Sequence, residues 1–189
     1  QAAVATWLTR RYKVAPEPVS RIVQEAWQLG ERSRLDPTLI LAVMAVESSF
    51  NPFAQSAVGA QGLMQVMTGV HIDKYENFGG RLAAFDPVTN LRVGAQVLKD
   101  CIRRAGGLEA GLRFYVGAAN LEDDGGYAGK VLAEQQRLRL VASGKQVPIF
   151  TAPSPLPAGT APARPAAESA KTDPVDAKVP DARVASLTP

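Results

Sequence analysis

One carboxyl group follows a long apolar segment of the chain. Glu47 comes directly after eight uninterrupted apolar residues, 39–46, and just before the polar sequence SSFN. A carboxylate at the edge of a dry core is disfavoured by desolvation, and the negative end of a helix dipole would add to that cost. Both effects predict a carboxyl group that holds its proton near neutral pH, which is what a general acid needs. A structural carboxylate at a helix end fits the same position, so both interpretations stay open here.

The element that positions Glu47 is predicted to be a buried helix. Asp36 is a suitable N-cap, and Pro37 is suited to the first helical position. The apolar residues that follow leave no polar stripe, which indicates a helix surrounded by the rest of its domain. Pro52 biases Asn51 away from helical geometry, so the helix should end shortly after Glu47.

A turn-rich segment with small and polar residues, 51–67, follows this helix. Gly62 would let a ligand or another backbone segment approach closely, and Gln65 could bind a neutral polar ligand through its amide. No Lys-Ser/Thr pair follows, which argues against a phosphate-binding loop. A loop that packs Leu63 and Met64 into the core fits the same residues.

The remaining patterns predict an all-α domain. Apolar residues recur at helical spacing before and after the central segment, and no convincing alternating strand is present. We expect five or six helices in residues 1–150, with any sheet confined to a small hairpin within residues 54–85. Residues 151–189 contain 8 Pro, 10 Ala and no aromatic residue. That composition predicts a disordered tail or linker.

Several classes of site are disfavoured. A single cysteine, Cys101, excludes an intramolecular disulfide, and its helical context predicts a buried structural thiol. His71, Asp73 and Glu76 could in principle bind a metal, but a plain surface loop is the favoured interpretation, and we expect no metal or cofactor. The net charge of +3 is mild and basic residues do not interleave with aromatic ones, so we expect no nucleic-acid partner. No apolar run reaches the length of a membrane span.

The segment ESSFNPFAQSAVGAQGLMQVM resembles the signature of the soluble lytic transglycosylases, lysozyme-like enzymes that cleave bacterial peptidoglycan. The matching elements are Glu47-Ser48, Pro52, Ala54, Ser56, Gly59-Ala60 and Gly62 to Gln65. FDPVTNLRVGAQVL is similar to the next block of that family. The resemblance implies a compact lysozyme-like domain, α+β at most, whose buried central helix carries the catalytic Glu47.

The resemblance also implies a reaction that needs only one acid. Hydrolytic glycosidases generally use two carboxylates. In the resembled family, the glutamate protonates the oxygen that links N-acetylmuramic acid to N-acetylglucosamine, and then acts as a base on the C6 hydroxyl of the same sugar. A 1,6-anhydro ring forms without water, because an intramolecular hydroxyl has a high effective molarity.

Substrate-binding roles are implied for six further residues. By resemblance, Tyr115 would lie against Glu47 or the charged sugar, while Ser48 and Ser56 would form hydrogen bonds near the acid. Met64 and Gln65 would line the glycan groove, beside Gly62. Each of these side chains also fits a structural role, as a core, cap or turn residue.

The last motif departs from the family, which usually has Ala-Tyr-Asn-Ala-Gly where this chain reads FYVGA. Val116 replaces the Asn, and Asn120 is a candidate to supply its hydrogen bond. Two alternatives therefore stay open. A hydrolytic muramidase like goose-type lysozyme would need a second acid such as Asp73, Glu76 or Asp86, and a scaffold with a decayed site would bind the wall polymer without turnover.

The substrate implied by the resemblance places the protein in the periplasm or cell envelope. The chain begins with Gln and shows no signal-peptide pattern, so we expect a mature or trimmed form of an exported protein. We expect a monomer that binds peptidoglycan glycan strands, with the tail, 151–189, as a candidate tether to an envelope protein.

Overall fold

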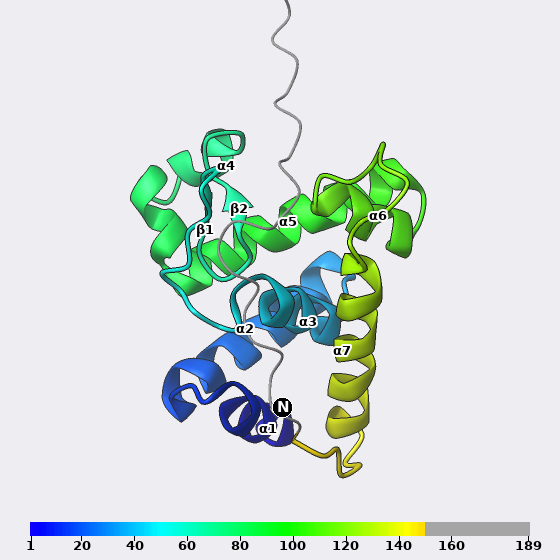
Figure 1. Cartoon of the computed structure of the whole chain (residues 1–189). Coiled ribbons are helices and arrows are strands. Elements are labelled where there is room, and N and C mark those ends of the chain that lie inside the picture. The colour runs from blue at the N-terminus through cyan, green and yellow to red at the C-terminus, as the bar shows by residue number, and fades with distance from the viewer. Residues whose placement is uncertain (150–189) are drawn as a thin grey trace, which may run out of the picture.

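The computed structural model describes residues 1–149, so the predicted tail lies outside the described residues. Their elements, shown in Figure 1, are in chain order α1 (Ala2–Tyr12), α2 (Pro16–Ser33), α3 (Pro37–Ser48), β1 (Ala60–Gln61), β2 (Val66–Met67), α4 (Ile72–Glu76), the 3-10 helix η1 (Arg81–Phe85), α5 (Pro87–Ala105), α6 (Leu108–Tyr115) and α7 (Tyr127–Ala142). The predicted helical domain with one small hairpin is confirmed. None of the helices in the described part is long and apolar enough to cross a membrane.

Helix α3 is the central helix, as predicted. Its first turn is capped by Asp36, whose Oδ1 accepts a hydrogen bond from the backbone N–H of Thr38 at 2.8 Å. Residues 39–44 are at most 3% exposed, and α3 lies alongside α7 and packs against α2 (Figure 1). An apolar helix enclosed in this way brings Glu47, in its last turn, to the edge of the core.

The hairpin lies beyond the end of α3 and is held against α5. Strands β1 and β2 pair antiparallel, with Ala60 opposite Met67. The turn between them is fixed by Asn90 of α5, whose Oδ1 accepts from the N–H of Met64 at 2.8 Å and whose Nδ2 donates to the carbonyl of Gln61 at 3.0 Å. Gly62 has φ +77°, and a Cβ there would collide with Asn90 and the carbonyl of Ala84, so only glycine fits this contact.

Helix α1 was not predicted from the sequence. Its N-cap, Gln1, makes no side-chain capping bond, and neither Pro nor Gly marks its start. The large apolar residues that it buries, Trp7 and Leu8, are followed directly by the basic run TRRYK, so the helical spacing of apolar residues stops after residue 8. Helix α1 packs on α2 and on the C-terminal half of α7, at the end of the molecule opposite the hairpin (Figure 1).

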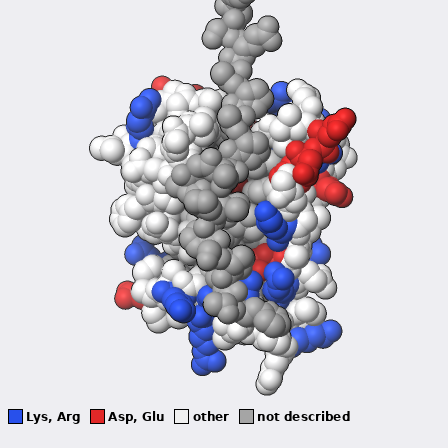
Figure 2. Space-filling model, in the orientation of Figure 1, with Lys and Arg blue, Asp and Glu red and all other residues white. Residues whose placement is uncertain are grey.

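Charge is unevenly spread over the surface. Figure 2 shows acidic side chains gathered over α6 and its connection to α7, while Lys and Arg are scattered over the rest of the visible face. The acidic residues of that connection are Glu122, Asp123 and Asp124. The connection therefore carries negative charge next to the first residue of α7, Tyr127.

Candidate active site

Glu47 is held by a tyrosine from a distant part of the chain. The hydroxyl of Tyr127 donates a hydrogen bond to Glu47 Oε1, with 2.7 Å between the oxygens. Glu47 is half-buried at the end of α3, and Tyr127, the first residue of α7, is 7% exposed. A phenol can donate to a carboxylate and stay hydrogen-bonded when the acid is protonated. This contact can therefore hold the carboxyl group in one orientation whether or not the acid carries its proton.

Two local features at the start of α7 position Tyr127. Gly126, the N-cap, has φ +72°, a conformation that favours glycine, and it turns the chain into the helix. The side chain of Asp124 accepts a hydrogen bond from the N–H of Ala128 at 2.8 Å, which satisfies one of the open donors of the first turn. A capped first turn resists fraying, so the Tyr127 hydroxyl stays within reach of Glu47.

The chain turns abruptly just after Glu47. Ser49 and Phe50 have φ of 50° and 65°, a left-handed conformation that is uncommon for residues other than glycine. The hydroxyl of Ser48 donates to the carbonyl of Leu63 at 2.7 Å, which joins the end of α3 to the hairpin turn. Ser48 therefore links the element that carries Glu47 to the predicted substrate-binding loop.

Ser56 and Gln65 shape that loop. Ser56 Oγ accepts from the N–H of Ala60 at 3.0 Å. Gln65 Nε2 donates to the carbonyls of Ala54 and Gly62, at 2.9 Å and 3.0 Å. Both side chains are half-buried, so they support the loop and also reach its surface.

Met64 and Tyr115 lie beneath the surface. Met64 is fully buried against Gly94, where a Cβ would come within 2.6 Å of the Met64 sulfur. The hydroxyl of Tyr115, which is 1% exposed, donates to the carbonyl of Met64 at 2.7 Å. Tyr115 therefore supports the loop through this bond, and Tyr127 is a second tyrosine, which donates to Glu47.

Sequence reasoning missed Tyr127. The residue stands at the start of the predicted last helix, but Glu47 precedes it by 80 positions, and no local pattern connects residues so far apart. The only signal was its position: a tyrosine that follows two glycines and opens a helix.

Other candidate residues make structural contacts. Asp86 caps α5 through the N–H of Thr89 at 2.7 Å, and Asp73 is exposed and pairs with Lys74 at 3.3 Å. Cys101 was predicted to be buried, but it is only half-buried and packs at the edge of the core. Within residues 1–149, no three or more His, Cys, Asp or Glu side chains form a group that could hold a metal ion.

Comparison with known proteins identifies a matching family. Residues 25–133 match the model of the family described as Transglycosylase SLT domain. A transglycosylase of Enterobacteria phage PRD1 is 37% identical over 102 residues, which cover 52% of this chain and 37% of the phage protein. Membrane-bound lytic murein transglycosylase C of Mannheimia succiniciproducens and of Glaesserella parasuis are each 40% identical over 77 residues, which cover 38% of this chain and 22% and 21% of those proteins. The chain thus matches well under half the length of these relatives.

Proposed function

Because the chain belongs to the Transglycosylase SLT domain family, we propose that it is a lytic transglycosylase that cleaves the glycan strands of peptidoglycan. The observation that carries this proposal is the placement of Glu47. It ends a buried helix, accepts a 2.7 Å hydrogen bond from Tyr127, and lies with Tyr127 inside the matched region 25–133. Named relatives that are transglycosylases support the same activity.

In the proposed reaction Glu47 acts first as an acid and then as a base. Its proton goes to the oxygen that links N-acetylmuramic acid to N-acetylglucosamine, and the bond from that oxygen to the muramic acid C1 breaks. The resulting oxocarbenium-like sugar is attacked by its own C6 oxygen, and Glu47 recovers a proton from that hydroxyl. The product is a 1,6-anhydro ring, and no water enters because the nucleophile is part of the substrate.

The other candidate residues would act in two groups. Ser56 and Gln65 are half-buried on the loop beside Glu47, and we assign them hydrogen bonds to the glycan. Gly62, Met64 and Tyr115 are buried and would keep that loop in shape. Ser48 would hold the end of α3 against the loop through its bond to Leu63.

A hydrolytic muramidase is the weaker alternative. It would need a second carboxylate to activate water. Of the three candidates, Asp86 is engaged as the cap of α5, and Asp73 and Glu76 are exposed residues of the short helix α4. A mechanism with one carboxyl group fits these placements better.

The proposal is tested by digestion of purified peptidoglycan. Soluble fragments would be quantified by chromatography after incubation with the wild-type protein or with Glu47→Gln, and binding of each to the insoluble polymer would be measured by co-sedimentation. We expect fragments from the wild type, none from Glu47→Gln, and binding by both. Binding without fragments from the wild type would instead identify a scaffold.

Further proposals concern the cellular setting. A peptidoglycan substrate places the protein in the cell envelope, with the periplasm as the proposed compartment. We propose that residues 1–150 form a monomeric catalytic domain and that residues 151–189 tether it to an envelope protein.

A further inference from the structure

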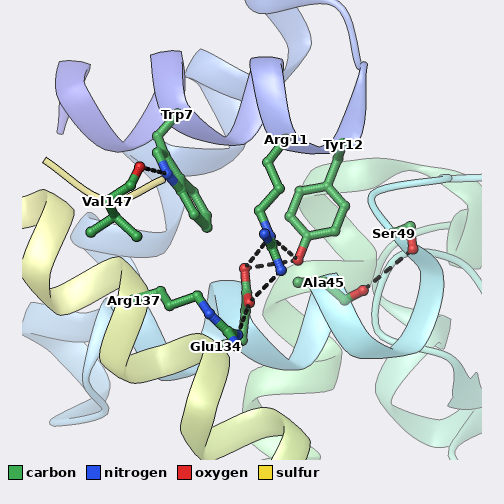
Figure 3. A network of polar contacts seen from close by, with 8 residues as sticks. All are labelled: Trp7, Arg11, Tyr12, Ala45, Ser49, Glu134, Arg137 and Val147. Atoms are coloured by element: carbon green, nitrogen blue, oxygen red, sulfur yellow. Dashed lines mark hydrogen bonds and ion pairs between the residues drawn. The ribbon is translucent and has the colours of Figure 1, made fainter. Parts of the chain in front are cut away.

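Helix α1 lies outside the matched region 25–133, yet it makes the most buried ion pair described in the chain. Arg11 Nε lies 3.1 Å from Glu134 Oε1 on α7, and both side chains are 4% exposed. The hydroxyl of Tyr12 donates to the same oxygen at 2.8 Å, and Arg137 donates to Oε2 at 2.7 Å (Figure 3). Burial, and next the charge of Glu134, raise the pKa of Tyr12 well above its usual range, so its hydroxyl stays a donor.

The ring of Tyr12 reaches the end of α3. It packs against Phe50, with 5.2 Å between the ring centroids. Phe50 is 4% exposed and is the second of the two left-handed residues that follow Glu47 and Ser48. Residues other than glycine keep this conformation only where their surroundings over-determine it. The Tyr12 ring is one of the contacts that hold Phe50 in place.

Two connections therefore join α7 to the end of α3. Tyr127 and Glu134 lie seven positions apart, about two turns, and so share one face of α7. Tyr127 bonds directly to Glu47, while Glu134 reaches Phe50 through Tyr12. The first connection uses residues within the matched region, and the second depends on α1.

We propose that Tyr12, held by Glu134 and Arg11, is a positioning residue for Glu47. It fixes the left-handed turn after α3 and thereby the position of the Glu47 carboxyl group relative to α7. The inference rests on the proposed function of Glu47 as the acid and base. It assigns to the N-terminal helix a role in catalysis that the family match does not cover.

Three variants test this role. Tyr12→Leu removes the ring from Phe50 and the hydroxyl from Glu134, whereas Tyr12→Phe removes the hydroxyl alone. Val4→Ala is the matched control, because Val4 is fully buried in α1 and is not part of the Tyr12 network. Melting temperatures would be measured for all three, and kinetics would be run well below the lowest of them.

The first readout is catalytic. Tyr12→Leu is expected to lower kcat roughly tenfold with KM nearly unchanged, because a misplaced acid affects the chemical step more than binding. Tyr12→Phe should give a smaller loss of kcat, and Val4→Ala should keep wild-type kcat and KM despite a lower melting temperature. Wild-type kcat in Tyr12→Leu, or an equal loss in Val4→Ala, would overturn the proposal.

The second readout needs no substrate. The N–H of Ser49 donates to the carbonyl of Ala45 at 3.2 Å, and the N–H of Asn51 donates to that of Ser48 at 3.0 Å. Hydrogen exchange at these two amides should accelerate in Tyr12→Leu and not in Val4→Ala, while amides in the middle of α3 stay protected. Unchanged exchange at both would overturn the positioning role even if the wild type proved inactive on peptidoglycan, so the two failures are distinguishable.

Discussion

At the scale of single residues, the proposed chemistry depends on one carboxyl group and the hydroxyl that holds it. Glu47 was recognisable from the sequence, because a charge that follows eight apolar residues is unusual and the surrounding motif resembles a family signature. Tyr127 was not, because its bond to Glu47 is a product of the fold. Residues whose role depends on distant contacts need the structure to be identified.

Tyr127→Phe should separate orientation from proton transfer. The substitution keeps the ring and removes the donor to Glu47 Oε1, so the carboxyl group gains rotational freedom while the group proposed to transfer the proton stays in place. We expect kcat to fall roughly 10- to 100-fold with little change in KM. Initial rates on purified peptidoglycan measure this, and a wild-type kcat would remove Tyr127 from the site.

Tyr115→Phe should have a different signature. The lost hydroxyl leaves the buried carbonyl of Met64 without that donor, which should cost about 1 to 3 kcal/mol in the free energy of unfolding. We expect a partial loss of activity, because the hairpin loop would be held less firmly. Denaturant unfolding and rates would be measured together, and wild-type values of both would refute the assigned role.

At the scale of elements, the sequence predicted α3 and the hairpin and missed α1. The Asp-Pro start of α3 and the glycines of the hairpin are local signals that need no tertiary information. Helix α1 has no such signals, and it is stabilised by burial of Trp7 and Leu8 and by the ion pair to Glu134. The ion pair joins α1 to α7, which lie far apart in the sequence, so local sequence patterns cannot predict it.

Asp124, in the connection between α6 and α7, stabilises the first turn of α7. Asp124→Ala removes the side-chain acceptor of the Ala128 N–H. The loss should lower the free energy of unfolding by about 1 kcal/mol and let the first turn of α7 fray. Because Tyr127 lies in that turn, kcat should fall as well. Asp124→Asn keeps a capping acceptor and is the matched control, for which near wild-type stability and kcat are expected. Equal losses in both variants would show that the charge, and not the cap, matters.

At the scale of the whole molecule, Asp36 joins the start of α3 to α7. Its Oδ2 lies 2.6 Å from a guanidinium nitrogen of Arg139, while its Oδ1 caps the helix. Burial acts to raise the pKa of Asp36, but hydrogen bonds from Thr38 and Arg139 outweigh it, and the pKa lies below its usual value. The ionised form of Asp36 is thus favoured more strongly in the folded protein than in the unfolded chain, so its charge stabilises the fold.

Acid should remove this contribution. A lowered folded pKa means that the unfolded chain binds more protons, so the stabilisation is present above the unfolded pKa, about 4, and is lost as the pH falls through the folded pKa. Asp36→Asn keeps a capping oxygen but has no charge for Arg139. We expect its melting temperature to lie below that of the wild type at pH 7 and the gap to close below about pH 4. A gap independent of pH would contradict this origin.

In the proposed mechanism, Glu47 alone serves as acid and base while the substrate supplies the nucleophile. Mass spectrometry of the fragments released from purified peptidoglycan tests it most directly, with Glu47→Gln alongside. We expect fragments one water lighter than those with a reducing end, and none from the variant. Reducing-end fragments, or undiminished release by Glu47→Gln, would contradict it.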